Sequence, residues 1–327
     1  MSYDIKLKVF TLRLKKSRAK KDPNRMWSEV FNLYEGNEQE KFNAFFKAYL
    51  ESFEGKFITY KNWPKAITVP ELDVHFKSKE RLFYGQFEGG PTNQTFRVKN
   101  LDNTGEGLLI EKNQVTSSPF YFIFHIPENS NLGLLIVQSM GEIQMHDILQ
   151  LNFQLFVKNL GIDVAIDYNE KITKEAIESY KKGNIKSITI RKSGLSKDIG
   201  DHLFTKKYQD YGDIKIELKV SFMDRLSNAL LIDDIKKSVL GKNPQIFEIA
   251  ALETLGIDEQ SDVFAKFEHK GRETTAKVED GVKLSPIYHV DSSDVPLDVN
   301  NHPHPTKMKE YLLSFMNKMI IETGLNS

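Results

Sequence analysis

The densest concentration of charged side chains in the chain is a basic segment near the N-terminus. Between residues 13 and 25 it places seven cations against a single acid, Asp22: Arg13, Lys15, Lys16, Arg18, Lys20, Lys21 and Arg25. Several cations on one connecting segment can neutralise several phosphates and release their counterions. The segment therefore predicts a nucleic-acid-binding surface. The alternative is a solvated loop after an edge strand, where lysine deters aggregation.

A second pattern that could support chemistry is the pair Glu217 and Lys219. Apolar and polar residues alternate over 214–222, so both side chains fall on the strand face opposite the core. A carboxylate and an ammonium group on one strand face can hold a divalent cation and polarise a water molecule. The alternative is an ordinary amphipathic strand that carries a same-face charge pair.

The Glu217 and Lys219 pair resembles the last half of the PD-(D/E)xK nuclease motif. That resemblance implies a metal-dependent nuclease that uses Mg²⁺, and the family also needs an aspartate on a preceding strand. Two upstream acids, Asp198 and Asp201, fall on a predicted helix, whereas Asp210 and Asp213 fall in the turn before the strand. The aspartate therefore has no matching position, and motifs this short often match by chance.

The histidines do not complete a metal site in the sequence. His302 and His304 are separated by one residue, but no neighbouring carboxylate pattern supplies further ligands. His125 lies in an apolar run, which indicates a core histidine. His146 and Asp147 stand at a helix start, where they fit roles as capping and helix-dipole partners. We predict no metal site and no cofactor, with Mg²⁺ required only under the nuclease alternative.

Composition excludes several classes of function. The chain has no cysteine, which removes disulfides, thiolate nucleophiles and Cys-type zinc sites and fits a cytoplasmic protein. Phosphate-binding-loop, dinucleotide-binding, serine-hydrolase and zinc-protease patterns are absent from the sequence, which favours a non-enzymatic role. Lys+Arg and Asp+Glu balance at 45 each, so attraction to nucleic acid needs a local patch. No apolar run is long enough to insert in a membrane.

The elements that position these residues predict an α/β (α+β) fold in two lobes. The first lobe covers 1–165 and has short alternating runs between 56 and 138, which predict a mainly antiparallel sheet. Helical spacing of apolar residues predicts flanking helices over about 38–53 and 144–160. The last two apolar runs of this lobe are predicted to form a buried hairpin within the sheet.

The second lobe covers 166–327. Strands predicted over 185–190 and 214–222, with a helix between them, indicate an α/β crossover. A hairpin follows, and a C-terminal amphipathic helix over 307–323 completes this lobe in the prediction.

Two parts of the chain resemble the layout of uncharacterised bacterial proteins from phage-defence neighbourhoods. The residues concerned are 120–130 and 133–138, with the helix that follows, and then 185–192 and 194–203. The resemblance implies a setting, nucleic-acid-linked defence, and it carries no residue of known role.

These observations predict a non-enzymatic subunit of a bacterial defence or mobile-element system that associates with nucleic acid or a protein partner. Two alternatives stay open. One is a metal-dependent nuclease built on Glu217 and Lys219. The other is a protein-only scaffold that forms a homo-oligomer, because a net charge near zero makes self-association easier.

Overall fold

The protein divides into two compact units, which are described separately. Unit 1 comprises Met1–Lys171 and Ile287–Ser327, and unit 2 comprises Ile172–Pro286. Unit 2 is therefore an insertion in the sequence of unit 1. A computed structural model of the chain describes residues 5–17, 24–61, 63–99, 102, 107–141, 143–171, 184–193, 215–221, 262–269, 272–278 and 288–325.

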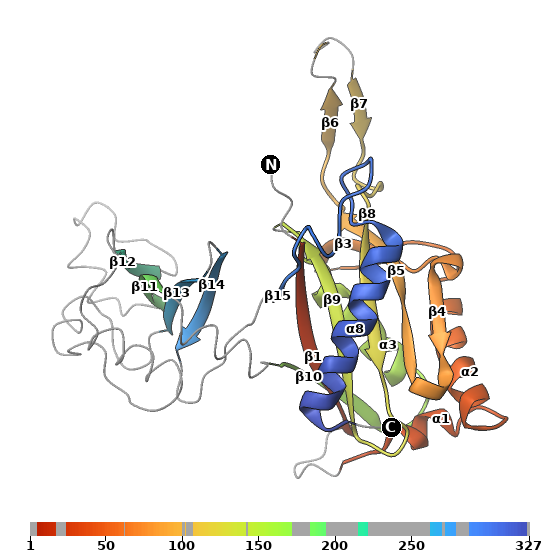
Figure 1. The fold of residues 1–327 in the computed structure, drawn as a ribbon. Helices are drawn as coiled ribbons and strands as arrows, with labels where there is room; N and C mark the ends of the chain where they lie inside the picture. The colour runs from red at the N-terminus through yellow and green to blue at the C-terminus, as the bar shows by residue number, and fades with distance from the viewer. Residues whose placement is uncertain are drawn as a thin grey trace, which may run out of the picture. The chain divides into compact units, whose positions relative to one another are not determined.

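Unit 1 is built on a sheet of nine strands in the order β10-β1-β9-β8-β5-β3-β2, with β15 added to β1 and β4 to β5 (Figure 1). All of its strand pairs are antiparallel. Two short 3-10 helices, η1 (Glu71–Asp73) and η2 (Ser78–Glu80), flank β4. The strands are β1 (Ile5–Lys16), β2 (Ile58–Tyr60), β3 (Trp63–Thr68), β4 (Val74–Lys77), β5 (Leu82–Pro91), β8 (Ser118–His125), β9 (Leu132–Met140), β10 (Val164–Glu170) and β15 (Tyr288–His289).

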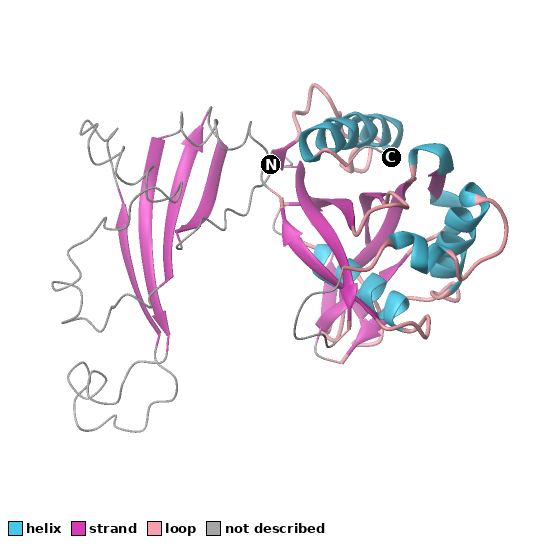
Figure 2. Cartoon of the chain, turned by 90° about the horizontal axis from the view of Figure 1, so that it is seen from below, coloured by secondary structure: helices cyan, strands magenta, loops and turns pink. Residues whose placement is uncertain are grey.

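Helices cover both faces of this sheet (Figure 2). One face carries α1 (Trp27–Phe31), α2 (Glu38–Glu51) and α3 (His146–Lys158), over a core rich in phenylalanine. The other face carries α8 (Pro305–Thr323). Alternation along β1 explains the two cores, because Leu12 and Leu14 belong to the first and Leu7 and Val9 to the second.

A separate two-stranded ribbon stands away from the main sheet (Figure 1). We call it the arm, and it consists of β6 (Phe96–Lys99) and β7 (Gly107–Ile110). Its base is held at Thr92, whose hydroxyl donates to the carbonyls of Lys112 and Gln114 at 3.3 Å each. Gly90 allows two backbone segments to lie close together at the same base, because a Cβ there would lie 1.9 Å from the carbonyl oxygen of Thr116.

Unit 2 contains a four-stranded antiparallel sheet in the order β12-β11-β13-β14. Its strands are β11 (Asn184–Ser193), β12 (Lys215–Ser221), β13 (Asp262–His269) and β14 (Arg272–Val278). The predicted α/β crossover needs correction here. β11 and β12 are adjacent and antiparallel, whereas a crossover would make them parallel. The predicted hairpin is present as β13 and β14.

The mixed α+β class and the mainly antiparallel first sheet are confirmed. The limits of the lobes differ from the predicted 1–165 and 166–327, because residues up to Lys171 and from Ile287 onward belong to unit 1. The C-terminal helix is present as α8, but its apolar side chains pack on the sheet of unit 1. Helical periodicity identifies the apolar face of α8, but it does not say which sheet that face covers.

Candidate nucleic-acid interface

The basic segment over 13–25 is in part a strand and not a connecting loop. Strand β1 continues to Lys16, so Arg13, Lys15 and Lys16 lie beside β10. Lys15 Nζ is 2.6 Å from Asp167 Oδ2, and Lys16 Nζ is 3.9 Å from Asp163 Oδ2. Asp167 lies in β10, and Asp163 directly precedes this strand. The two lysines therefore face carboxylates from the neighbouring part of the chain.

The remaining described cations of the segment also have polar partners. Arg13 Nη2 donates to Asn24 Oδ1 at 2.9 Å, and Arg25 Nη1 donates to Glu29 Oε2 at 2.7 Å. Arg18, Lys20 and Lys21 lie outside the described residues. The described cations of this segment thus have polar partners within unit 1, and phosphate binding by the segment stays a prediction.

Glu217 and Lys219 lie on β12, and both side chains are exposed. The register places Glu217 opposite Arg191 of β11, whose Nε donates to Glu217 Oε2 at 2.8 Å. Lys219 is opposite Thr189. Directly paired residues share a face of the sheet, so the predicted common face of Glu217 and Lys219 agrees with this register.

Among the described side chains, Glu217 does not belong to a group that could hold a metal ion. Among these residues no group of three or more histidine, aspartate or glutamate side chains is placed to hold a metal ion. Asp198, Asp201, Asp210 and Asp213 all lie outside the described part of the chain. The nuclease alternative therefore stays a prediction.

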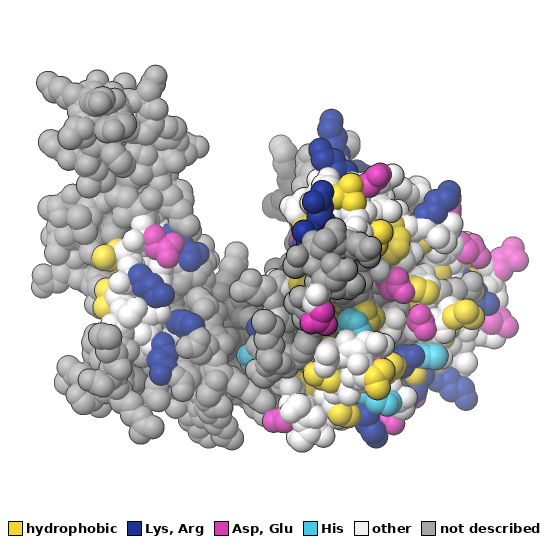
Figure 3. Space-filling model, turned by 90° about the horizontal axis from the view of Figure 1, so that it is seen from above, with side chains coloured by type: hydrophobic (Ala, Val, Ile, Leu, Met, Phe, Trp, Pro, Cys, Tyr) yellow, Lys and Arg dark blue, Asp and Glu magenta, His cyan; other side chains and the backbone are white. Residues whose placement is uncertain are grey.

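The structure describes the charged side chains of only a part of unit 2. Of the five that are described, one is an acid, Glu217, and the others are Lys186, Arg191, Lys219 and Lys266. Lys266 of β13 pairs with Ser187 of β11, on the same face as Arg191 and Lys219. In Figure 3 the described lysine and arginine side chains of this unit lie near one another, with an acidic side chain beside them. We call Arg191, Lys219 and Lys266, which share this face with Glu217, the basic face.

The backbone explains why these cations lie close to one another. Neighbouring strands are about 4.8 Å apart, and alternate residues of one strand return to the same face. The opposite face holds Ile188 and Ile190, which are buried and anchor β11. Burial of that apolar face orients the polar face outward, so the arrangement can present several cations to one extended polyanion.

The predicted histidine positions are structural within unit 1. His125 is buried on β8, with Nδ1 3.2 Å from the Glu80 carbonyl and Nε2 3.0 Å from the Leu325 carbonyl. The prediction of a core histidine is confirmed. His302 and His304 lie in the loop before α8, where the backbone N–H of His302 donates to Asp298 Oδ1 at 2.9 Å.

His146 and Asp147 stand at the start of α3, as predicted, and Asp147 lies in its first turn. Asp147 accepts from Lys65 Nζ at 2.5 Å, and the same ammonium donates to the Gln144 carbonyl at 2.7 Å. His146 stacks on Phe10 with ring centroids 5.2 Å apart. Burial, and then the charge of Lys8, lower the pKa of His146 to about 4. The pair therefore packs α3 against the sheet.

Acid is expected to destabilise the protein through His146. Its pKa in the folded state, about 4, lies below the ordinary 6.5, so the unfolded chain binds more protons between these values. The contribution is complete above pH 6.5 and is lost as the pH falls toward 4. Urea unfolding at pH 7 and pH 5 should show that His146→Phe removes on the order of 1–2 kcal/mol of this pH dependence. His304→Phe replaces an exposed histidine and should leave this pH dependence unchanged. An equal change in both variants would contradict the assignment of the pH dependence to His146.

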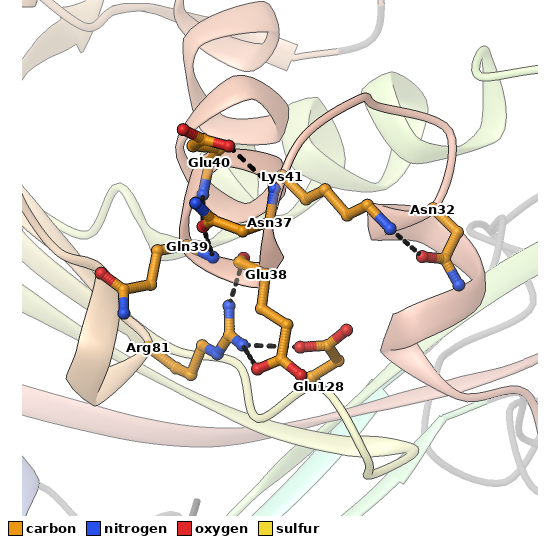
Figure 4. Close-up of polar contacts among 8 residues, drawn as sticks. All are labelled: Asn32, Asn37, Glu38, Gln39, Glu40, Lys41, Arg81 and Glu128. Carbon is orange, nitrogen blue, oxygen red and sulfur yellow. Dashed lines mark hydrogen bonds and ion pairs between the residues drawn. The ribbon is translucent and has the colours of Figure 1, made fainter.

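An ion cluster at the start of α2 was not predicted from the sequence. Buried Arg81 donates from Nη1 to the Glu38 carbonyl at 2.6 Å and from Nη2 to Glu128 Oε2 at 2.6 Å (Figure 4). The Asn37 carboxamide caps the helix by accepting from the N–H of Glu40 at 3.1 Å. The sequence marks the start of this helix by the capping pattern of Asn37 and Glu40. That pattern does not indicate that Arg81 pairs with the helix start.

No protein-family model matches the chain, and no curated protein matches it either. In the part of the chain that the structure describes, no helix has the length and apolar character needed to cross a bilayer.

Proposed function

We propose that the protein is a non-enzymatic, nucleic-acid-binding component that contacts its ligand through the basic face of unit 2. The observation that carries this proposal is the placement of lysine and arginine side chains on three adjacent strands, β12, β11 and β13. A sheet face of this kind can contact successive phosphates without reading base identity. Thr189, which lies opposite Lys219, adds a hydroxyl of the type that contacts phosphate oxygens.

The basic face is preferred over the N-terminal segment because its cations come from three adjacent strands of one sheet. On both surfaces a phosphate would have to compete with carboxylates, which are Asp167 and Asp163 beside Lys15 and Lys16 and Glu217 beside Arg191. The absence of cysteine supports a cytoplasmic location, where nucleic acid is present. The resemblance of the sequence layout to phage-defence-associated proteins supplies the setting for this proposal.

Reversal of two charges on the basic face should weaken nucleic-acid binding. We expect the double variant Lys219→Glu and Lys266→Glu to bind labelled single- or double-stranded DNA or RNA at least ~10-fold more weakly in fluorescence anisotropy. Loss of two phosphate contacts should also reduce the slope of log affinity against log salt by roughly 2. The matched control reverses Lys47 and Lys79, which are exposed lysines of unit 1 and produce the same change in net charge.

Three outcomes would redirect the proposal. Equal loss in the Lys47 and Lys79 control would indicate a response to overall charge alone. Loss only on reversal of Lys15, Arg18 and Lys20 would return the contact to the N-terminal segment. Cleavage that needs Mg²⁺ or Mn²⁺ and disappears in Lys219→Ala would establish the nuclease alternative.

A further inference from the structure

The two faces of the arm differ in chemistry. In an antiparallel pair, directly opposite residues lie on the same face. The register therefore gives one wholly apolar face, formed by the pairs Phe96–Ile110 and Val98–Leu108. The other face is formed by the pairs Arg97–Leu109 and Lys99–Gly107. We call the first of these the apolar arm face.

The apolar arm face is open to solvent at the pair farther from the base. Leu108 is 70% exposed and Val98 is 52% exposed. An isolated two-stranded ribbon is marginally stable in water, and contiguous exposed aliphatic side chains mark a surface that binds another molecule. The contacts of Thr92 and Gly90 at the base hold the arm away from the main sheet (Figure 1). The apolar arm face is therefore not covered by that sheet.

Charge placement favours a second copy of this chain as the molecule that covers the face. Arg97 and Lys99 lie on the opposite face, so two apolar arm faces can meet without bringing these cations together. A patch without charge is self-complementary under two-fold symmetry, which is the commonest symmetry of soluble oligomers. The formal net charge of zero adds no long-range repulsion between copies.

The composition of the arm's end disfavours a lipid surface as the occupant. Residues 100–106, which join β6 to β7, read Asn-Leu-Asp-Asn-Thr-Gly-Glu and include two acids. A hairpin that enters a bilayer end-on would need apolar residues at that position, and anionic headgroups repel acids.

We propose that two copies of the protein associate by packing their apolar arm faces against each other about a two-fold axis. Four side chains per copy cannot supply the roughly 800 Å² per partner of a standard stable interface. The dimer is therefore reversible and concentration-dependent, with exchange between monomer and dimer. This interaction uses unit 1 only and is independent of the nucleic-acid contact proposed for unit 2.

Sedimentation velocity over a wide concentration range tests the proposal on the full chain. The intact protein should shift from monomer toward dimer as its concentration rises, and Leu108→Asp should abolish the shift. Leu109→Asp is the matched control, because Leu109 is an aliphatic residue 46% exposed on the opposite arm face. Both positions are exposed, so neither variant removes a core contact, and circular dichroism verifies the fold.

Chemical crosslinking provides a second readout, because the chain has no cysteine. With a short bismaleimide, Val98→Cys and Leu108→Cys should give crosslinked dimers in far higher yield than Leu109→Cys. A strict monomer at every concentration would overturn the proposal, as would a dimer that Leu108→Asp leaves unchanged. A monomer that binds anionic phospholipid vesicles, and loses this binding in Leu108→Asp, would overturn it in favour of a lipid contact.

Discussion

Replacement of Arg81 by methionine is expected to lower the free energy of unfolding by about 3–5 kcal/mol, the usual cost of breaking a buried ion pair by removing one partner. Arg81 is buried between the start of α2 and the loop after β8, where it contacts Glu38 and Glu128. The Glu128 side chain is only 14% exposed, so the variant leaves its carboxylate with little access to water. Methionine keeps a Cβ at this residue, whose φ is 54°, so the backbone strain stays the same.

Urea denaturation of three variants separates the buried pair, Arg81 and Glu128, from the exposed pair, Arg81 and Glu38. Glu38→Gln should cost less than about 1 kcal/mol, because that side chain is 73% exposed and its pairing with Arg81 is screened by water. The double variant Arg81→Met and Glu128→Met should recover much of the loss seen in Arg81→Met, since no buried charge remains. A cost for Arg81→Met as small as that of Glu38→Gln would contradict the burial of this cluster.

Excision of unit 2 is expected to leave unit 1 folded. The two ends left by removal of residues 172–286 are held close together, because the Tyr288 hydroxyl donates to the Lys171 carbonyl at 3.3 Å. Both ends are also fixed to β1, through the bond from the Lys171 N–H to the Val9 carbonyl at 2.8 Å and through the pairing of β15. A Gly/Ser linker of a few residues should therefore replace unit 2 without separating β10 from β15.

The excised protein should unfold in one cooperative transition and lose nucleic-acid binding. Circular dichroism during urea titration follows the first result, and fluorescence anisotropy follows the second. The intact chain that carries Lys219→Glu and Lys266→Glu is the matched control, because it keeps unit 2 but changes the basic face. A non-cooperative transition would contradict the independence of unit 1. Binding equal to that of the intact chain would contradict the proposed contact surface.

Local sequence patterns were sufficient for most elements of unit 1. The apolar runs that predict a buried hairpin correspond to β8 and β9, and the helices predicted over 38–53, 144–160 and 307–323 correspond to α2, α3 and α8. These patterns succeed because burial of one face imposes a period of 2 or 3.6 on a short segment. They contain no information on which distant segment covers that face, and α8 was therefore assigned to the wrong lobe.

The same limit explains the outcome for the candidate sites. A count of charges along the chain identified the cations at Lys15 and Lys16 but not Asp167 and Asp163, which antiparallel pairing with β10 brings beside them. The shared face of Glu217 and Lys219 was predictable from alternation within one strand. The contribution of Lys266 to that face was not, because it depends on the register between β11 and β13.

The discontinuous course of unit 1 has a consequence for its biosynthesis. The ribosome completes β8 and β9 long before it makes α8, which covers Ile123, Leu134 and Ile136 in the finished protein. At 5–20 residues per second, translation from residue 172 to residue 304 takes roughly 7–27 s. The nascent chain therefore carries an uncovered aliphatic sheet surface for that interval, and such a surface is prone to aggregation. Slower codons within unit 2 would lengthen this exposure and lower the yield of native protein.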